Sequence, residues 1–331
     1  MKILNSKIID FLQNSGLESF QIKPIAGDAS SRQYYRLTKN TKTLILMDSS
    51  SSQETIQSFF DVREFLEERG YSVPQLIEYD LNKGILILED LGLETLDLYL
   101  RDNAKEHLEI YDAVINLLIS FQKLNNVPFP NFDKTFFLQE LTYFTDWYMP
   151  YIGKTLTESG RKEFNKCWEP SLDYIAEKDN TRVFVHKDLH CGNLFWIPER
   201  NGVQRLGVID FQGGKSGSVS YDITSFLNDC RNPLPYKLRC RLLDNFRSKI
   251  GLEKDTFKNI CDIYVAQRNI KILGNFTGIY QREGKSTYMK FIPNSWTFIM
   301  ESFKNPLLQD VKDWFIRHNV NLKFMHQERL Y

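Results

Sequence analysis

The chain has 331 residues, which is long for one compact domain and predicts two lobes or one large domain. Hydrophobic residues make up 42%, charged residues 25% and aromatic residues 14%, and these fractions exclude a disordered, collagen-like or coiled-coil chain. Lysine and arginine together number 42, as do aspartate and glutamate, so the formal net charge is zero. This balance gives no electrostatic reason to expect nucleic acid or a membrane surface as a partner.

The cysteines and the apolar segments predict a cytoplasmic protein. The chain has five cysteines, an odd number, with no CxxC spacing, which favours a reducing compartment over a disulfide framework. Polar residues interrupt the apolar ones over residues 1–16, so this segment predicts an amphipathic helix and not a signal peptide. No apolar run approaches the roughly 20 residues that span a bilayer.

The first part of the chain predicts a small β-rich lobe. Short runs rich in β-branched and aromatic residues predict strands at residues 20–26, 33–37, 43–47 and 85–88. Small and polar residues over 27–32 predict a tight hairpin. Apolar residues at helical spacing predict a helix over 53–69, which Gly70 ends, and another extended segment begins at Val73.

Long amphipathic segments dominate after residue 95. They predict helices at residues 95–101, 107–123, 136–149, 156–177, 223–229, 236–250, 257–280 and 311–319. Short β-type runs over 183–185 and 207–209 interrupt this pattern. The sequence therefore predicts an α+β fold, with residues 1–92 as a small lobe and residues 93–331 as a larger helical lobe.

The segment His-Lys-Asp-Leu-His-Cys-Gly-Asn, residues 186–193, is the most informative of the chain. Asp188 and Asn193 fit the spacing D-x-x-x-x-N, and Asp210 follows a β-type run downstream. Phosphoryl transfer needs one carboxylate to accept the proton of an attacking hydroxyl, and an amide with a second carboxylate to hold Mg²⁺ on the phosphates. We therefore predict Asp188 as the catalytic base and Asn193 and Asp210 as the metal ligands.

The same segment admits other interpretations. His186, Asp188 and His190 alternate on an extended segment and could converge on zinc, but a zinc site leaves Asn193 and Asp210 unexplained. For His186 alone we predict a role in bracing the loop through a nearby backbone group or carboxylate. Asp222 is the candidate partner, and a plain helix cap is the alternative for that residue.

These motifs resemble the aminoglycoside-phosphotransferase and choline-kinase side of the protein-kinase-like fold. More closely, the sequence resembles the bacterial anomeric amino-sugar kinases of cell-wall recycling, which phosphorylate N-acetylmuramate and N-acetylglucosamine at C1. The matching segments, besides the catalytic ones, are residues 27–36, 46–48, 88–92, 140–148 and 267–274. The resemblance extends from about residue 20 to 295. It implies a two-lobed fold that uses ATP and Mg²⁺, with residues 1–92 as the nucleotide-binding lobe and residues 93–331 as the catalytic and substrate lobe.

The predicted nucleotide-binding residues are Gly27, Ser30, Ser31, Arg32, Glu89 and Leu91. In the hairpin over 27–32, glycine lets the backbone approach a phosphate, successive N–H groups can form an anion-binding nest, and the serines and arginine add donors. Without the resemblance this segment is only a hairpin turn. The resemblance implies that backbone groups of Glu89 and Leu91 face adenine, although acidic residues there also suit the cap of the next helix.

Two departures from the protein kinases bear on function. Met47 stands where those kinases carry a lysine on the third strand. Arg32 and Arg36 are the candidates to replace the positive charge of that lysine. Alternatively, Mg²⁺ and the hairpin N–H groups suffice without it. The chain reaches Asp222 soon after Asp210, without room for a long activation segment and without an A-P-E motif. A small molecule is therefore expected as the substrate, not a protein.

The candidate substrate residues are Trp147, Arg268 and Lys271. Aromatic residues around Trp147 suit a cage for a choline-like cation, stacking on a sugar ring, or helix packing. Arg268 and Lys271 share a helix face and could bind the carboxylate of a muramate lactyl group, or form a solvated basic face. A polycationic aminoglycoside would need a cluster of carboxylates in the C-terminal helices, whereas the last segment of the chain has more basic than acidic residues.

We predict an ATP- and Mg²⁺-dependent phosphotransferase with an alcohol group as acceptor, which phosphorylates the anomeric hydroxyl of N-acetylmuramate and N-acetylglucosamine. Another small-molecule kinase, of the aminoglycoside, choline or homoserine type, is the first alternative. The second is a pseudokinase-like nucleotide-binding or regulatory module, which the missing strand lysine suggests and the intact set of Asp188, Asn193 and Asp210 opposes. The sequence carries no signal for an oligomeric state.

Overall fold

The computed structural model describes residues 5–25, 32–52, 56–124, 126–179 and 181–320. The chain folds as two compact units. The first unit takes residues 1–114 and 191–213, and the second takes residues 115–190 and 214–331. The chain thus passes from the second unit to the first between His190 and Cys191, inside the predicted catalytic segment. The functional division at residues 92 and 93 stays a prediction.

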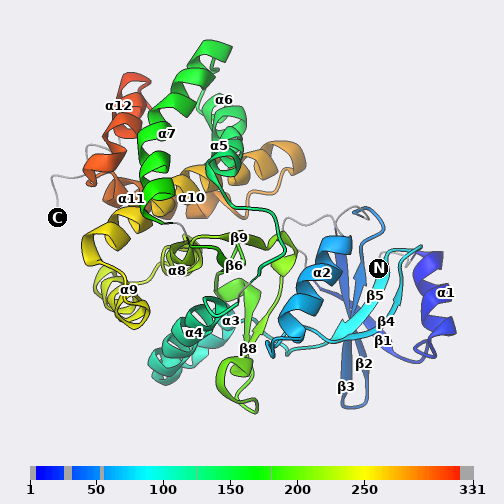
Figure 1. Cartoon of the computed structure of the whole chain (residues 1–331). Coiled ribbons are helices and arrows are strands. Elements are labelled where there is room, and N and C mark those ends of the chain that lie inside the picture. The colour runs from blue at the N-terminus through cyan, green and yellow to red at the C-terminus, as the bar shows by residue number, and fades with distance from the viewer. Residues whose placement is uncertain (1–4, 26–31, 53–55, 125, 180, 321–331) are drawn as a thin grey trace. The chain divides into compact units, whose positions relative to one another are not determined.

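The first unit contains a five-stranded antiparallel sheet with strand order β1-β2-β3-β5-β4 (Figure 1). Its strands are β1 (Gln21–Ile25), β2 (Gln33–Lys39), β3 (Lys42–Asp48), β4 (Leu76–Asp80) and β5 (Ile85–Glu89). Helices α1 (Ser6–Asn14) and α2 (Ile56–Glu67) lie on opposite sides of this sheet in Figure 1. The predicted order of one helix, three strands, one helix and two strands is confirmed.

Side-chain alternation explains how this sheet is covered. Successive residues of a strand point to opposite faces, so Leu37, Leu44 and Leu46 share one face with Ile85 and Ile87. The buried side of α1 packs on that face. Helix α1 begins at Asn5, whose side chain accepts a hydrogen bond from the N–H of Lys7 at 3.1 Å.

The remaining elements of the first unit either come after β5 in the chain or belong to residues 191–213. They are α3 (Leu96–Asp102), a short 3₁₀ turn (Ala104–Glu106), the start of α4 (His107–Phe121), and the antiparallel strands β7 (Leu194–Trp196) and β8 (Leu206–Val208). Three more 3₁₀ turns cover Cys191–Asn193, Gly202–Arg205 and Phe211–Gly213. The β8 strand overlaps the predicted run over 207–209, whereas β7 was not predicted.

The second unit is mainly helical. Its helices are α5 (Lys134–Tyr143), α6 (Met149–Tyr151), α7 (Glu158–Lys178), α8 (Val219–Leu227), α9 (Tyr236–Ile250), α10 (Lys254–Glu283), α11 (Ile292–Ser302) and α12 (Gln309–Arg317). A π-helical turn, Phe144–Tyr148, joins α5 to α6, and 3₁₀ turns cover Met289–Phe291 and Pro306–Leu308. Strands β6 (Val183–Val185) and β9 (Lys215–Gly217) pair in antiparallel fashion. Helix α11 and strand β9 were not predicted.

Helix α10 is the central element of the second unit. It begins at Glu253, whose carboxylate accepts hydrogen bonds from the N–H groups of Asp255 and Thr256, and it ends at Gly284 in the left-handed conformation. Most of its middle, residues 263–279, is buried against the other helices, and this is why it is apolar on several sides instead of one. Every functional side chain of α10 discussed below lies in this buried stretch.

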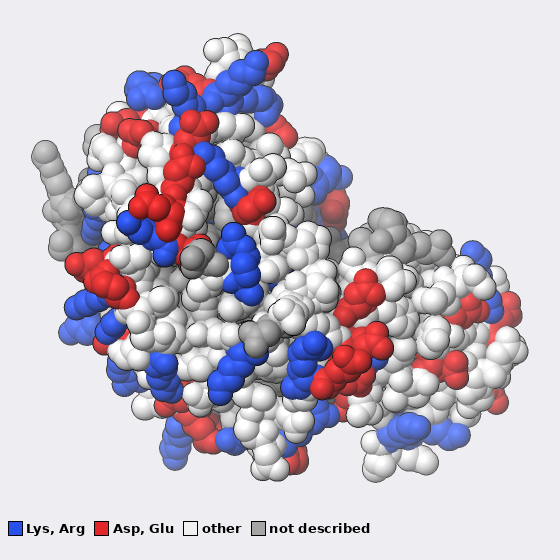
Figure 2. All heavy atoms as spheres, in the orientation of Figure 1, with Lys and Arg blue, Asp and Glu red and all other residues white. Residues whose placement is uncertain are grey.

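The surface agrees with the zero net charge of the sequence. On the face that Figure 2 shows, lysine and arginine side chains are interspersed with aspartate and glutamate side chains, and neither sign dominates that face. No helix of the described residues is both long and apolar enough to cross a membrane.

The helix predicted over 136–149 is continuous in the structure, but residues 144–148 form a π-helical turn in place of an α-helical one. The backbone at the start of this turn lies directly against Gly274 of α10. A Cβ atom at Gly274 would lie 2.2 Å from the carbonyl carbon and oxygen of Tyr143 and 2.4 Å from the nitrogen of Phe144. Only glycine fits this approach of two backbones.

We expect Gly274→Ala to lower the free energy of unfolding by about 3 kcal/mol, because the added methyl group meets backbone atoms that cannot move alone. Gly160→Ala is the matched control. Gly160 lies in the first turn of α7, where a Cβ would meet only side chains at ordinary distance, 3.5 Å. That control should be neutral or stabilising by up to about 1 kcal/mol.

Urea unfolding followed by circular dichroism measures both variants. Equal midpoints for Gly274→Ala and the wild type would show that the π-helical turn can withdraw from α10 without cost, contrary to this account.

Candidate active site

The loop that follows β6 is held by a carboxylate of α8. Asp222 accepts hydrogen bonds from the backbone N–H of His186 at 2.6 Å and from that of Lys187 at 3.0 Å. The ring nitrogen Nδ1 of His186 accepts from the backbone N–H of Asp188 at 3.3 Å. Lys187 has a φ of 76°, a conformation that non-glycine residues rarely adopt and that the two bonds to Asp222 stabilise. The structure thus brings together the predicted pair of His186 and Asp222.

Asp188 is bound by an arginine from α10. A guanidinium nitrogen of Arg268, Nη2, lies 2.7 Å from Oδ1 of Asp188, and its Nη1 donates to the carbonyl of Lys187 at 3.2 Å. The Arg268 side chain is only 2% exposed, whereas that of Asp188 is 43% exposed. The second carboxylate oxygen, Oδ2, lies 3.8 Å from Nε2 of His190. A fixed, buried cation therefore orients a carboxylate that still faces solvent.

This arrangement sets the charge of Asp188. Loss of water around the carboxylate would raise its pKa. The charge and hydrogen bond of Arg268, together with the charges of His190 and Arg231, outweigh that effect and hold the pKa of Asp188 well below its usual value. Burial and the charge of Arg231 lower the pKa of the neighbouring His190. Asp188 is consequently a carboxylate at neutral pH, ready to accept a hydrogen bond from a hydroxyl group.

The two predicted metal ligands lie together in the first unit. The side-chain nitrogen of Asn193 is 3.5 Å from Oδ2 of Asp210, and the carbonyl of Asn193 accepts from the N–H of Ile209 at 3.1 Å. Asp210 has a φ of 60°, and Gln212 donates to its Oδ1 at 2.6 Å. The next residue, Phe211, is fully buried and stacks on a ring of α2, which anchors the strained backbone.

The donor set of Asn193 and Asp210 fits Mg²⁺ in a nucleotide complex. Mg²⁺ takes oxygen ligands and is usually held by one or two protein groups together with substrate phosphates and waters. One carboxylate and one amide oxygen from neighbouring residues meet that requirement. Among the described residues no group of three His, Cys, Asp or Glu side chains is placed to hold a metal ion, so the zinc alternative finds no support.

The side chains near Met47 indicate which arginine can replace the strand lysine. Met47 is fully buried and lies opposite Tyr34 in the register of β2 and β3. Arg32 donates to Oγ of Ser49 at 3.2 Å. Burial raises the pKa of Tyr34, with Arg32 opposing the rise and Asp210 adding to it, so both charges lie near the Tyr34 hydroxyl.

Arg36 is engaged elsewhere. Its guanidinium forms two bonds to the carboxylate of Asp90, at 2.7 and 3.1 Å, and a third to the carbonyl of Gly92 at 2.6 Å. The Arg36 charge is therefore balanced at the end of β5, which leaves Arg32 as the candidate to replace the strand lysine.

The other predicted nucleotide-binding residues are described only in part. Gly27, Ser30 and Ser31 lie outside the described residues. The Glu89 side chain forms an ion pair with Arg200, and its backbone N–H donates to the carbonyl of Gln75 at 2.8 Å. Leu91 packs against Gly207 of β8, where a Cβ would lie 2.9 Å from a Leu91 methyl group.

The three predicted substrate residues lie in the second unit. Trp147 belongs to the π-helical turn, and the guanidinium of Arg282 lies 4.6 Å from its ring centre. Lys271 is 3.2 Å from the carboxylate of Glu140, and Arg268 binds Asp188. Arg268 and Lys271 share a face of α10 as predicted, but that face is buried, so the alternative of a solvated basic face is wrong.

Sequence reasoning assigned no role to Glu140, although this carboxylate is buried and binds Lys271. These two residues are far apart in the chain, and a local pattern cannot reveal their contact.

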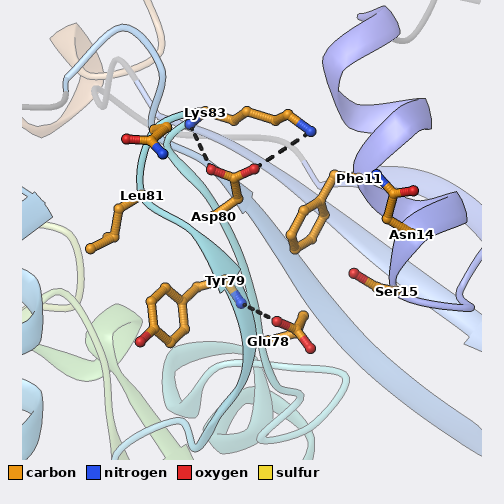
Figure 3. A pocket seen from close by; sticks show the side chains of 9 residues that line it. Phe11, Asn14, Ser15, Glu78, Tyr79, Asp80, Leu81 and Lys83 are labelled. Atoms are coloured by element: carbon orange, nitrogen blue, oxygen red, sulfur yellow. Dashed lines mark hydrogen bonds and ion pairs between the residues drawn. The ribbon is translucent and has the colours of Figure 1, made fainter.

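Figure 3 shows a surface pocket of the first unit, lined by Phe11, Asn14, Ser15 and residues 78–83. It contains none of the predicted site residues.

Comparison with known proteins places these residues in context. The sequence pattern of the phosphotransferase enzyme family matches residues 21–249. An N-acetylmuramate/N-acetylglucosamine kinase of Pseudomonas aeruginosa is 30% identical over 84% of this chain and 82% of that protein. A kinase of the same name from Caulobacter vibrioides is 27% identical over 93% of this chain and 94% of that protein.

The solved structures show the fold. The structure of choline kinase LicA from Streptococcus pneumoniae superimposes with a TM-score of 0.64 at 15% identity, over 89% of this chain and 99% of that chain. This likeness confirms the predicted α+β, protein-kinase-like fold.

Proposed function

Because the chain belongs to the phosphotransferase enzyme family, we propose that it is an ATP- and Mg²⁺-dependent kinase that phosphorylates the anomeric hydroxyl of N-acetylmuramate and N-acetylglucosamine. The observation that carries the kinase chemistry is the solvent-facing carboxylate of Asp188, fixed by the buried Arg268. The choice of sugar rests on two relatives of that name, each aligned over more than four-fifths of its length. Such an enzyme would act in cell-wall recycling, and its predicted cytoplasmic location stays a prediction.

Asp188 orients the substrate hydroxyl and accepts its proton. A carboxylate with a lowered pKa is a weak base, so it takes the proton only as the oxygen bonds to phosphorus and becomes acidic. Arg268 keeps the carboxylate in place for that step. Most of the rate enhancement then comes from positioning and charge neutralisation. Asn193 and Asp210 would hold Mg²⁺, which offsets the charge of the phosphates when it is bound.

Residues 1–92 would bind the nucleotide, and residues 93–331 would supply the base and the sugar contacts. The backbone of Gly27, Ser30 and Ser31 would receive the phosphates, with Arg32 as the cation that replaces the strand lysine. Backbone groups of Glu89 and Leu91 would face adenine. In the second unit, Trp147 would stack on the sugar ring, as partly exposed aromatic residues do.

Replacement of the base should separate catalysis from binding. We expect Asp188→Asn to lower kcat for N-acetylmuramate by about 100- to 10,000-fold, while the affinity for ATP and Mg²⁺ stays within about twofold. Asparagine keeps an oxygen for Arg268 but not the negative charge, so the variant should be less stable, and circular dichroism confirms that it is folded before rates are measured. Asp210→Asn should instead weaken Mg²⁺-dependent nucleotide binding by about tenfold or more.

Initial rates and calorimetry with ATP, with and without Mg²⁺, measure these effects. An active Asp188→Asn variant would remove Asp188 from the role of base. An unchanged Mg²⁺ dependence of nucleotide binding in Asp210→Asn would remove that residue from the metal site. Nucleotide binding without turnover of any acceptor by the wild type would favour the regulatory alternative.

The ion pair with Arg268 predicts the pH dependence. In Arg268→Gln the positive charge that lowers the pKa of Asp188 is lost, so the pKa rises and the carboxylate is protonated at higher pH. We expect the acid limb of the kcat/KM profile to move to higher pH by about one to three pH units.

Arg317→Gln is the matched control, since Arg317 forms an exposed ion pair with Glu163. Its profile should coincide with that of the wild type. An acid limb that stays in place in Arg268→Gln would contradict the claim that Arg268 sets the charge of Asp188.

A further inference from the structure

A cluster of three lysines surrounds one buried carboxylate beside the loop of Asp188. Lys271 of α10 lies 3.2 and 3.3 Å from the two carboxylate oxygens of Glu140. Lys187, which directly precedes Asp188, lies 3.3 Å from the first of these oxygens. The third member, Lys215 of β9, is close enough for the charges of Lys187 and Glu140 to act on it. We call these residues the lysine cluster; it holds three positive charges and one negative charge.

Lys215 is the member without a carboxylate of its own. Strand pairing places it opposite Val185, two residues before Lys187. The ammonium groups of Lys187 and Lys215 lie 4.9 and 5.2 Å from the centre of the same Phe136 ring, and the charge of Lys187 acts on Lys215. Within the described ranges, no carboxylate forms an ion pair or hydrogen bond with Lys215.

The excess positive charge of the lysine cluster is unfavourable when no anion is bound. Partial burial and the neighbouring Lys187 lower the pKa of Lys215, and Glu140 compensates only in part. Two like charges held against one apolar ring repel each other, and a bound anion would turn that repulsion into attraction. The Lys187 side chain is 26% exposed and Lys215 is half-buried, so both can contact a ligand. The Lys271 side chain is only 8% exposed, and it binds Glu140 from the buried side.

We propose that Lys187 and Lys215 bind the carboxylate of an acidic sugar substrate, and that Glu140 and Lys271 hold Lys187 in place. This inference rests on the proposed function. N-acetylmuramate carries a lactyl carboxylate that N-acetylglucosamine lacks. Helix α10 holds Asp188 through Arg268 and, one turn further along, holds Glu140 through Lys271, and Glu140 also binds Lys187. In this proposal one sugar offers its carboxylate to Lys187 and Lys215 and its hydroxyl to Asp188. The cluster is then the part of the site that distinguishes the acidic sugar from the neutral one.

The test compares N-acetylmuramate with its uncharged carboxamide, by calorimetry on the full-length protein. Charge-assisted hydrogen bonds from two lysines predict that the wild type binds the acid about 10- to 100-fold more tightly than the amide. Lys215→Gln should reduce this preference to about twofold or less, and Lys215→Arg, which keeps the charge, should retain most of it.

Lys162→Gln is the matched control. Its side chain is 77% exposed on α7, so the variant makes the same change in net charge away from the cluster and should keep the full preference. Circular dichroism of each variant confirms folding before binding is measured.

Several results would overturn the proposal. One is a wild type that binds the acid and the amide equally, or binds neither. Another is a Lys215→Gln variant that keeps the preference. If Lys215→Gln loses affinity for ATP and Mg²⁺ while the preference for the acid persists, the anion of the cluster is a phosphoryl group of the nucleotide and not the sugar carboxylate.

Turnover is recorded separately for both sugars. If the wild type phosphorylates neither of them, the proposed function fails, while the binding preference still decides whether the lysine cluster recognises a carboxylate.

Discussion

The ion pair between Arg268 and Asp188 is the interaction on which the reactive part of this chain depends. Arg268 is buried on α10 and Asp188 faces solvent, so the pair has a fixed inner end and an outer end that a ligand can reach. A buried guanidinium without a partner would be strongly unfavourable, since the cost of removing a charge from water is large. The fold therefore needs the carboxylate as much as the carboxylate needs the arginine, which links stability to reactivity at this position.

Helix α10 organises the surrounding site through residues spaced three and four apart. Arg268 binds Asp188, Lys271 binds Glu140, and Gly274 admits the backbone of the π-helical turn. One turn further, Gly278 lies under Trp147, where a Cβ would be 3.0 Å from the indole. Residues with this spacing share one face of a helix. A single buried face thus positions the proposed base Asp188, supports the lysine cluster and places the aromatic residue predicted to meet the sugar.

The sequence was sufficient for the features that depend on local pattern. The order of helices and strands in the first part of the chain followed from alternation and turn residues. The D-x-x-x-x-N spacing predicts roles for Asp188 and Asn193, and those roles stay predictions. The likeness to known kinases confirms the fold. What failed depends on contacts between distant segments. Nothing near residue 144 signals the π-helical turn, whose backbone lies against Gly274 of another helix.

The same limit applies to the charged residues. Helical spacing placed Arg268 and Lys271 on one face, but it could not say that this face is buried or that each residue pairs with a carboxylate far away in the chain. Strand β9, with the sequence Lys-Ser-Gly, contains no β-branched or aromatic residue, so its sequence gives no strand signal. The lysine cluster depends on the pairing of β9 with β6 and is therefore visible only in the fold.

The most direct measurement is ADP release with ATP and Mg²⁺ across a panel of acceptors, with the phosphorylated position identified by ³¹P NMR. The panel contains N-acetylmuramate, N-acetylglucosamine, glucosamine, an aminoglycoside, choline and homoserine. This account predicts turnover of the two N-acetylated sugars with the phosphate at C1. Turnover of choline, homoserine or an aminoglycoside instead, with none of the sugars phosphorylated, would contradict it.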